Sequence, residues 1–309
     1  MSGGSTRVAV IDVGTNSARL LVADVADGKV SPAERRSQVT RLGRGVDLAG
    51  RLSAEAIEDA CEAIGGYVSA YEELGAEVVE AIATSAVRDA ENGSAFVAEL
   101  RERFALSARV LDGEEEARLT YLGATSENSP TEPTLVVDIG GGSTELIVGT
   151  GAEISFHASL QAGVVRHSER HIASDPPTAV ELESLAADVR GLIEAAVGDG
   201  LVASAGIAVA GTPTSLAAVE MELEPYDPAR VHGHVLSLRS IQRMLSRLAS
   251  APLAQRVEIP GLHPARAPTI VAGVVILIET MRAFELERIE VSEHDILYGT
   301  AIHAAKIRA

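Results

Sequence analysis

Two stretches of apolar residues, each interrupted by a turn of small residues, give the clearest pattern in the chain. V-A-V-I-D-V-G-T-N-S-A-R-L-L-V spans residues 8–22, and T-L-V-V-D-I-G-G-G-S-T-E-L-I-V spans residues 134–148. Runs rich in Val, Ile and Leu that flank a Gly-containing turn are typical of strand–turn–strand hairpins. The two copies align without a gap and share a D-x-G-x-x-S core, which two unrelated buried hairpins would rarely share. This internal repeat predicts two related domains.

The rest of the chain alternates between helical and strand patterns. Asp27-Gly28 is typical of a tight hairpin turn, and Ser53 and Gly75 bound a helix whose apolar residues, Cys61 among them, recur at helical spacing. Asn92 is the expected N-cap of a helix that ends near Phe104. Further strands are predicted at 78–83, 108–111 and 206–210, and further helices after Gly113 and at 176–197, 213 onward, 238–248 and 268–284. Alternating strands and helices predict the α/β class.

The domain joint is predicted at residues 126–133, S-E-N-S-P-T-E-P, where turn-forming and polar residues are concentrated. A chain of 309 residues also exceeds the size of most single cores. We therefore expect an N-terminal domain at 1–128 and a C-terminal domain at 129–292. Ser292 with Asp295 three residues later predicts a capping box for a terminal helix at 293–309.

Each hairpin combines an aspartate, Asp12 or Asp138, with a turn that can bind phosphate. Successive backbone N–H groups in a glycine-containing turn form a concave anion site. An aspartate beside such a site would repel phosphate unless a divalent cation joined them, and Mg²⁺, or Mn²⁺ as the alternative, prefers such oxygen ligands. Thr212, as N-cap before Pro213 at the first helical position, predicts a further phosphate site at a helix N-terminus. An ordinary capped helix is the alternative.

Composition limits the partners. The formal net charge of −18 argues against nucleic acid and anionic membranes, and the aromatic content of 3% against base stacking. A polyanionic ligand would therefore need local arginines or a metal. The single cysteine, Cys61, points to a reducing cytoplasm, and residues 1–7 lack the apolar core of a signal peptide. The longest apolar run, 270–278, is far shorter than the ~20 residues of a membrane helix.

Several other motifs are absent or weak. The chain has no G-x-x-x-x-G-K-[ST] phosphate loop and no G-x-S-x-G nucleophile turn. His167 and His171 are four residues apart but lack the glutamate of the zinc-protease motif, so we expect both to face solvent. Glu114, Glu115 and Glu116 open a helix, where the dipole favours negative charge, and taken alone they predict a solvated first turn.

Five motifs in order nevertheless resemble one family. They are D-V-G-T-N-S at 12–17, T-S-A-V-R-D-A at 84–90, G-E-E-E-A-R-L at 113–119, D-I-G-G-G-S-T-E at 138–145 and A-G-T-P-T-S-L at 210–216. In these residues the chain is similar to the exopolyphosphatase / guanosine pentaphosphate phosphohydrolase family, from about residue 8 to residue 301. The resemblance implies the actin, sugar-kinase and heat-shock-chaperone ATPase superfamily, in which two ribonuclease-H-like domains enclose a phosphate chain in a cleft. It also implies that the terminal helix packs on the first domain.

The resemblance assigns roles residue by residue. Glu116 is implied as the catalytic base that activates water, which reverses the expectation of a solvated turn. Asp12, Asp138 and Glu145 are implied at the metal. The expected phosphate-binding residues are Gly14, Thr15, Asn16, Ser17, Arg19, Arg88, Gly140, Gly141, Gly142, Ser143, Thr144, Gly211, Thr212 and Arg266. Arg19 and Glu145 occupy equivalent positions, so we interpret the first hairpin as offering a cation to phosphate and the second a carboxylate to metal.

The leading hypothesis is a Mg²⁺-dependent exopolyphosphatase that releases orthophosphate from chain ends. Long family members continue into further C-terminal modules and this chain does not, so shorter polyphosphate chains are expected. Hydrolysis of guanosine pentaphosphate, a step of the stringent response, is the alternative within the same chemistry. An ATP-binding kinase-like protein and a non-catalytic phosphate-chain sensor are alternatives of other classes. Family members are often dimers, so the resemblance makes a homodimer one option, while the sequence itself leaves the oligomeric state open.

Overall fold

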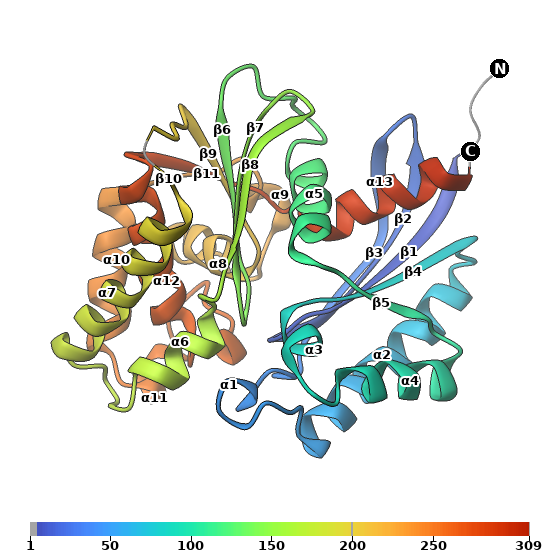
Figure 1. The fold of residues 1–309 in the computed structure, drawn as a ribbon, viewed down its shortest axis with the longest axis horizontal. Coiled ribbons are helices and arrows are strands. Elements are labelled where there is room, and N and C mark those ends of the chain that lie inside the picture. The colour runs from blue at the N-terminus through green and yellow to red at the C-terminus, as the bar shows by residue number, and fades with distance from the viewer. Residues whose placement is uncertain (1–4, 199, 309) are drawn as a thin grey trace. The chain divides into compact units, whose positions relative to one another are not determined.

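The computed structural model describes residues 5–198 and 200–308. The first four residues of the expected N-terminal domain, and Ala309 at the end of the expected terminal helix, lie outside these residues. The chain divides into two compact units. The first unit runs up to Asn128 and takes up the chain again from His294, and the second unit is Ser129–Glu293. Each unit is built on its own sheet, drawn in Figure 1.

The sheet of the first unit has the strand order β3-β2-β1-β4-β5. Its strands are β1 (Thr6–Val13), β2 (Ser17–Ala26), β3 (Lys29–Val39), β4 (Val78–Ala83) and β5 (Ala108–Val110). The first three strands pair antiparallel. β4 pairs in parallel with β1, and β5 pairs in parallel with β4. Asp27 and Gly28 both have positive φ, 50° and 77°, which confirms the predicted tight turn between β2 and β3.

Helices cover both faces of this sheet. Alternate strand residues point to opposite faces, and β1 carries apolar residues on both, so each face needs a covering layer. Ala9 and Ile11 of β1 belong to a core that includes buried residues of α2 (Ala54–Glu73) and α4 (Gly93–Phe104). Val8 and Val10 pack on the other face with buried residues of α13 (Ile296–Arg308). In Figure 1, α13 lies beside α5 (Gly113–Ala124). Two short helices, α1 (Val46–Ala49) and α3 (Ser85–Asp89), complete the unit within the described residues.

The sheet of the second unit has the order β10-β11-β9-β6-β7-β8. Its strands are β6 (Thr134–Ile139), β7 (Thr144–Thr150), β8 (Glu153–Leu160), β9 (Ala205–Val209), β10 (Val235–Ser237) and β11 (Arg288–Val291). Read from β8, the first five strands repeat the order and the directions found in the first unit. The repeat seen in the two hairpins therefore extends to whole sheets, and β10 is an added edge strand.

The second unit carries the helices α6 (Val164–His171), α7 (Ala179–Ala196), α8 (Gly211–Glu220), α9 (Pro228–Val231), α10 (Leu238–Ser250), α11 (Leu253–Arg256) and α12 (Ile270–Ala283), with a 3₁₀ turn at Pro264–Arg266. Its core is centred on α12, which is buried from Ile270 to Met281. The α/β class expected from the sequence is confirmed. Among the described residues, no helix is both long and apolar enough to cross a membrane.

Of two expected helix caps, one holds the expected position and the other was wrong. Asn92 is the N-cap of α4, as expected, and its backbone O accepts from Phe96 N at 3.1 Å. Its side chain does not cap the helix; it accepts from Leu52 N at 2.8 Å and donates to Leu52 O at 3.0 Å. Ser292 does not open the terminal helix, because its backbone N–H continues the pairing of β11 by donating to Ala208 O at 2.9 Å. The helix begins at Ile296, and Asp295 Oδ1 accepts from Leu297 N at 3.0 Å.

Candidate functional site

The turn of the first hairpin, Gly14–Ser17, is held in place by hydrogen bonds from neighbouring segments. Gly14 N donates to Ser17 O at 3.1 Å and closes the turn. Thr15 O accepts from Gly43 N at 2.8 Å, while its hydroxyl oxygen accepts from Ala86 N at 3.2 Å on α3. The turn is therefore preorganised, as a backbone phosphate site requires.

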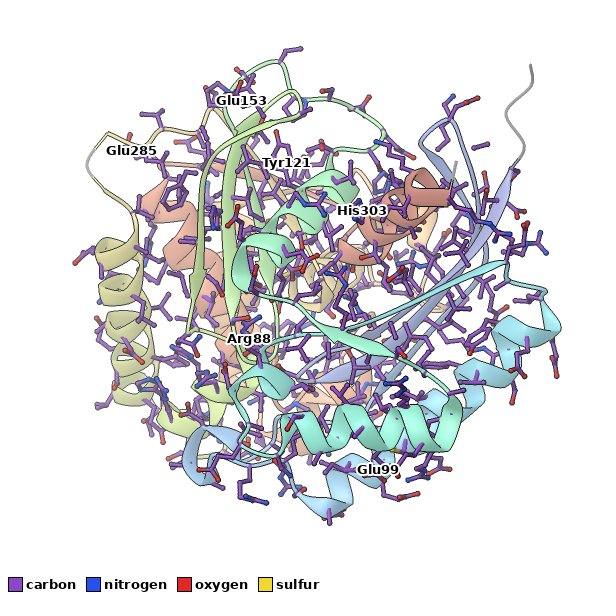
Figure 2. The ribbon with its side chains drawn as sticks, turned by 45° about the vertical axis from the view of Figure 1, so that its right-hand side comes forward. Arg88, Glu99, Tyr121, Glu153, Glu285 and His303 are labelled. Carbon is purple, nitrogen blue, oxygen red and sulfur yellow. The ribbon has the colours of Figure 1, made fainter. Side chains whose placement is uncertain are left out.

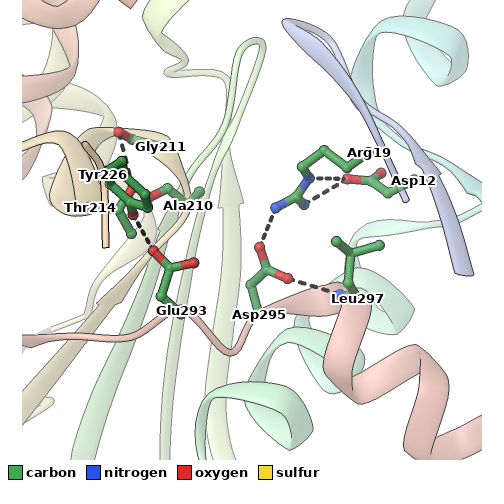
Figure 3. Close-up of polar contacts among 9 residues, drawn as sticks. All are labelled: Asp12, Arg19, Ala210, Gly211, Thr214, Tyr226, Glu293, Asp295 and Leu297. Atoms are coloured by element: carbon green, nitrogen blue, oxygen red, sulfur yellow. Dashed lines mark hydrogen bonds and ion pairs between the residues drawn. The ribbon is translucent and has the colours of Figure 1, made fainter. Parts of the chain in front are cut away.

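Asp12 lies at the end of β1, opposite Arg19 of β2, and is almost completely buried. Its Oδ2 accepts from Arg19 Nε at 2.9 Å and from Nη2 at 2.6 Å. Arg19 also contacts Asp295 through Nη1, as Figure 3 shows. Among the described residues, Asp12 Oδ1 has no hydrogen-bond partner. Burial raises the pKa of Asp12, and the Arg19 guanidinium, which lowers it, offsets this only in part.

Asp295 was not among the expected site residues. The sequence assigned it only to a helix start, whereas the fold brings it to Arg19 from the far end of the chain, 276 residues away. Arg19 thus lies between two carboxylates of the same unit. If Arg19 binds phosphate, as expected from the sequence, it must do so while paired with these two carboxylates or after leaving them.

Glu116 occupies the first turn of α5, behind the N-cap Asp112, whose side chain accepts from Glu115 N at 2.8 Å. Glu114 on the same turn is exposed, but Glu116 is buried. Its Oε2 accepts from Arg88 Nη1 at 2.9 Å, and the same nitrogen donates to Leu111 O at 2.9 Å. A fully solvated turn, the expectation from helix chemistry alone, is therefore wrong for Glu116.

The environment of Glu116 favours its protonated form. Burial is the main cause and raises the pKa of this carboxyl above its ordinary value, while the hydrogen bond and the charge of Arg88 lower it in part. The negative charge of Asp12 raises it further. Arg88, labelled in Figure 2, comes from α3. In the first unit the structure thus brings Glu116 and Arg88 together, and Asp12 and Arg19 together.

The turn of the second hairpin, at Gly140–Ser143, is fixed by the start of α6. Gly140 O accepts from Val164 N at 3.0 Å, and Gly141 O accepts from Val165 N at 2.9 Å. Gly142 O accepts from Arg166 Nε at 2.8 Å. A methyl group at Gly163 would stand 2.3 Å from Gly141 O, so only glycine permits this approach. Arg166 was missed from the sequence because nothing in its local pattern distinguishes it.

Asp138 and Glu145 pair across β6 and β7, in the register that Asp12 and Arg19 have in the first unit. Both carboxylates are buried, and Glu145 Oε1 accepts from Ser159 Oγ at 3.0 Å. The hydroxyl of Thr144 donates to Ala162 O at 2.5 Å. The two carboxylates therefore lie side by side at the edge of the turn that was predicted to bind phosphate.

The helix of the third predicted segment starts two residues earlier than expected. Ala210 takes a positive φ of 70°, and α8 begins at Gly211, so Thr212 is not the N-cap. Arg266 lies directly against this start: a methyl group at Gly211 would stand 1.4 Å from Arg266 Nη1. The structure thus brings together Gly211, Thr212 and Arg266 of the second unit.

A tyrosine that the sequence did not single out lies near the same helix start. Tyr226 donates its hydroxyl hydrogen to Glu293, and Thr214 donates to Ala210 O at 2.9 Å (Figure 3). Tyr226 is 45% exposed, and the partial burial of its phenol, followed by the nearby Glu293, raises its pKa. The phenol is therefore a neutral hydrogen-bonding group at the start of α8.

The expected exposure of His167 and His171 was wrong. His167 is completely buried, and the side chain of His171 is only 14% exposed. Both lie on α6, where an apolar helix face turns towards the second-unit core. The missing zinc-protease glutamate excluded one motif, but it said nothing about burial.

Comparison with known proteins gives one consistent result. A model of the Ppx/GppA phosphatase family matches residues 21–301. Exopolyphosphatase 2 of Mycobacterium tuberculosis is 36% identical over 316 aligned positions, which cover 97% of this chain and 99% of that protein. Among solved structures, the Ppx/GppA family member of Aquifex aeolicus is 31% identical with a TM-score of 0.84, and 99% of both chains is covered. An exopolyphosphatase-like protein is 34% identical with a TM-score of 0.93, again over 99% of both chains.

These similarities confirm the resemblance expected from the sequence and the actin-like ATPase fold that it implied. They also confirm the expected class of enzyme, a hydrolase of phosphoanhydride bonds. The chain belongs to the Ppx/GppA phosphatase family.

Proposed function

We propose that this protein is an exopolyphosphatase that hydrolyses the terminal phosphoanhydride bond of inorganic polyphosphate and releases orthophosphate. The observation that carries the proposal is the buried Glu116, with Arg88 Nη1 at 2.9 Å from its Oε2. A carboxylate base and an arginine so placed are the groups needed to activate water beside a phosphate. The similarity to the mycobacterial Exopolyphosphatase 2 supports polyphosphate as the substrate.

Glu116 is assigned as the general base. Burial raises its pKa, which makes the carboxylate a stronger base while it remains ionised above that pKa. Oε2 receives the hydrogen bond from Arg88, so we assign proton uptake from the attacking water to Oε1. The water then attacks the terminal phosphorus in line with the leaving phosphate.

The oxygen donors of each hairpin suit a divalent cation. Asp12 Oδ1 is a buried oxygen without a partner among the described residues, and Asp138 and Glu145 present adjacent buried carboxylates. Mg²⁺ prefers oxygen ligands of this kind, and Mn²⁺ accepts them. When bound, such an ion neutralises charge on the phosphate oxygens. Metal ligation is assigned to Asp12 in the first unit, and to Asp138 and Glu145 in the second.

Phosphate groups are assigned to backbone and arginine groups. The turns at Gly14–Ser17 and Gly140–Thr144, with Gly211 and Thr212, offer N–H and hydroxyl donors. Arg19, Arg88 and Arg266 provide the local positive charge that a chain of net charge −18 needs in order to bind a polyanion. For Arg19 this requires that phosphate compete with, or join, its pairing to Asp12 and Asp295.

A substrate panel scored by phosphate release tests the proposal. Short and long polyphosphate, guanosine pentaphosphate and ATP are each measured with Mg²⁺, with Mn²⁺ and with a chelator. Metal-dependent release from polyphosphate without any acceptor is expected, and the panel also reports whether shorter chains are preferred.

A preference for guanosine pentaphosphate of more than about 100-fold in kcat/KM would replace polyphosphate as the substrate and give the chain a role in the stringent response. Transfer to an acceptor would indicate a kinase. Binding of polyphosphate without turnover would indicate a sensor.

A further inference from the structure

Two histidines and one aspartate meet on the paired helices α6 and α7 of the second unit. His167 and His171 are one turn apart on α6, and their ring centroids are 5.5 Å apart. Asp188 of α7 places Oδ2 at 2.9 Å from His171 Nε2 and at 3.5 Å from His167 Nε2. One coordinating atom from each of the three residues lies within 4.8 Å of the other two.

The ring nitrogens of His167 are buried without hydrogen bonds among the described residues. The side chain of His167 is 0% exposed. Buried polar groups are normally paired, so an unpaired imidazole inside a core is costly.

We propose that His167, His171 and Asp188 form a binding site for a transition-metal ion of the Zn²⁺ class. Zn²⁺ bonds nitrogen and oxygen at about 2.0–2.2 Å, so neighbouring ligand atoms of a tetrahedral site are about 3.3 Å apart. The distances of 2.9 and 3.5 Å from Asp188 Oδ2 to the two imidazole nitrogens lie on either side of this value. Two imidazoles with one carboxylate favour Zn²⁺ over Mg²⁺ or Ca²⁺.

The surroundings of the three residues suit such an ion. His171 Nδ1 lies 3.2 Å from Ser184 Oγ, the kind of outer contact that orients a ligating imidazole. Asp188 is 34% exposed, which gives an ion access from solvent and leaves the fourth position to water. Arg170 opposes binding, because its Nη1 lies 3.9 Å from Asp188 Oδ2, but its side chain is 37% exposed and can turn into solvent.

The site is adjacent to the phosphate turn without being part of it. The first turn of α6 donates from Val164 N and Val165 N to Gly140 O and Gly141 O. A metal ion bridging α6 to α7 would hold α6 in place one helical turn after these two residues. It would thereby also stabilise the hydrogen bonds from α6 to Gly140 and Gly141. The inferred role is therefore to stabilise the element that carries Gly140 and Gly141.

The test is metal binding to the full chain, measured by calorimetry with Zn²⁺ and by the absorption of bound Co²⁺. Wild type should bind one ion at this site, with Co²⁺ giving the strong visible bands of a four-coordinate ion, and excess Mg²⁺ should not displace it. Asp188→Asn and His171→Ala should each weaken Zn²⁺ binding at this site by at least about 100-fold. Both side chains are partly exposed, and Asp188→Asn keeps the shape of the residue, so both variants should fold.

His234→Ala is the matched control. His234 Nε2 lies 2.7 Å from Glu220 Oε2 in the same unit, so the variant removes a histidine–carboxylate pair that is not one of the three residues of the proposed site. It should bind Zn²⁺ as the wild type does. Equal Zn²⁺ affinity in wild type, Asp188→Asn and His171→Ala would overturn the proposal, as would loss of binding in the control alone.

Hydrogen exchange supplies a second readout. Zn²⁺ should slow exchange of the Val164 and Val165 amides in the wild type but not in Asp188→Asn. No slowing in wild type that has bound Zn²⁺ would overturn the inferred stabilising role. Because binding and exchange are measured without substrate, their outcome is independent of whether the chain hydrolyses polyphosphate.

Discussion

At the scale of single residues, Arg88 changes the acid–base chemistry of Glu116. Glu116 is buried and accepts a hydrogen bond from Arg88 at 2.9 Å. Burial makes the negative charge of the carboxylate unfavourable, and the positive charge of Arg88 offsets part of that cost. Glu116→Gln keeps the size of the side chain and removes the base. We expect kcat for phosphate release from polyphosphate to fall by about 10²- to 10⁴-fold, while polyphosphate binding persists.

The neighbouring Glu114 gives the matched control. It lies on the same turn of α5 but is exposed, so Glu114→Gln should leave kcat close to that of the wild type. Steady-state phosphate release and a direct polyphosphate-binding assay measure the two quantities. Undiminished turnover in Glu116→Gln would remove this residue from the mechanism.

The pH dependence follows from the direction of the Glu116 shift. Burial raises its pKa above the ordinary 4.5, and the reaction needs the carboxylate, so activity should be lost as the pH falls through that raised pKa. The acid limb of the kcat profile should therefore lie above pH 4.5. For stability the sign is opposite: the protonated acid is the form that burial tolerates, so its contribution is lost as the pH rises.

Arg88 provides the diagnostic change, since it is the group that lowers the pKa of Glu116. Arg88→Gln should move the acid limb to higher pH, in addition to raising KM. Arg101→Gln, an exposed position near the end of α4, should leave the limb in place. An acid limb that does not move in Arg88→Gln would show that another group controls it.

At the scale of elements, α5 and α13 pack so closely that glycine is required on both. A methyl group at Gly123 of α5 would stand 1.9 Å from Asp295 O, and one at Gly299 of α13 would stand 1.8 Å from Leu119 O. Backbone atoms cannot yield as a side chain does, so the helices would have to separate. This matters for the site because α5 carries Glu116 and α13 follows directly after Asp295.

Gly123→Ala should therefore destabilise the protein by about 1–3 kcal/mol, the usual cost of overpacking. Gly66→Ala is the control: it is an exposed glycine within α2 with nothing within 4 Å of the added methyl. That change should stabilise by about 1 kcal/mol through helix propensity. Denaturant unfolding measures both, and equal stability of the two variants would contradict the close packing.

At the scale of the whole molecule, the repeat of the two hairpins could be predicted from the sequence because each copy is formed by consecutive residues. Strands, tight turns and the two Asp-centred hairpins follow from apolar runs and small residues, and so do most helices. Asp295 and Arg266 reach their partners only through long-range folding, which no local pattern records. Glu116 illustrates the same limit, since helix chemistry predicted a solvated turn and only the family resemblance assigned it a role. The His167 cluster was dismissed for lack of a motif, although burial, not the motif, distinguishes it.

The order of the chain gives the last prediction. The first unit is interrupted at Asn128 and completed only by the stretch from His294. Leu297, Tyr298 and Ala301 of α13 fill a core against β1 and β2. A chain ending at Glu293 would leave this face of the first sheet uncovered and Arg19 without Asp295. We expect the first unit to lose its hydrogen-exchange protection, while the second unit, whose core contains no residue of α13, keeps its own.

A shorter deletion serves as the control, because it distinguishes the effect of losing α13 from the effect of removing the last few residues. Removing residues 307–309 takes away the exposed Ile307 but none of the buried residues of α13, so protection in both units should stay near the wild-type level. Exchange measured peptide by peptide distinguishes the units. Retained protection of β1 and β2 in the chain ending at Glu293 would mean that the first sheet is stable without its second helical layer, and that α13 serves mainly to bring Asp295 to Arg19.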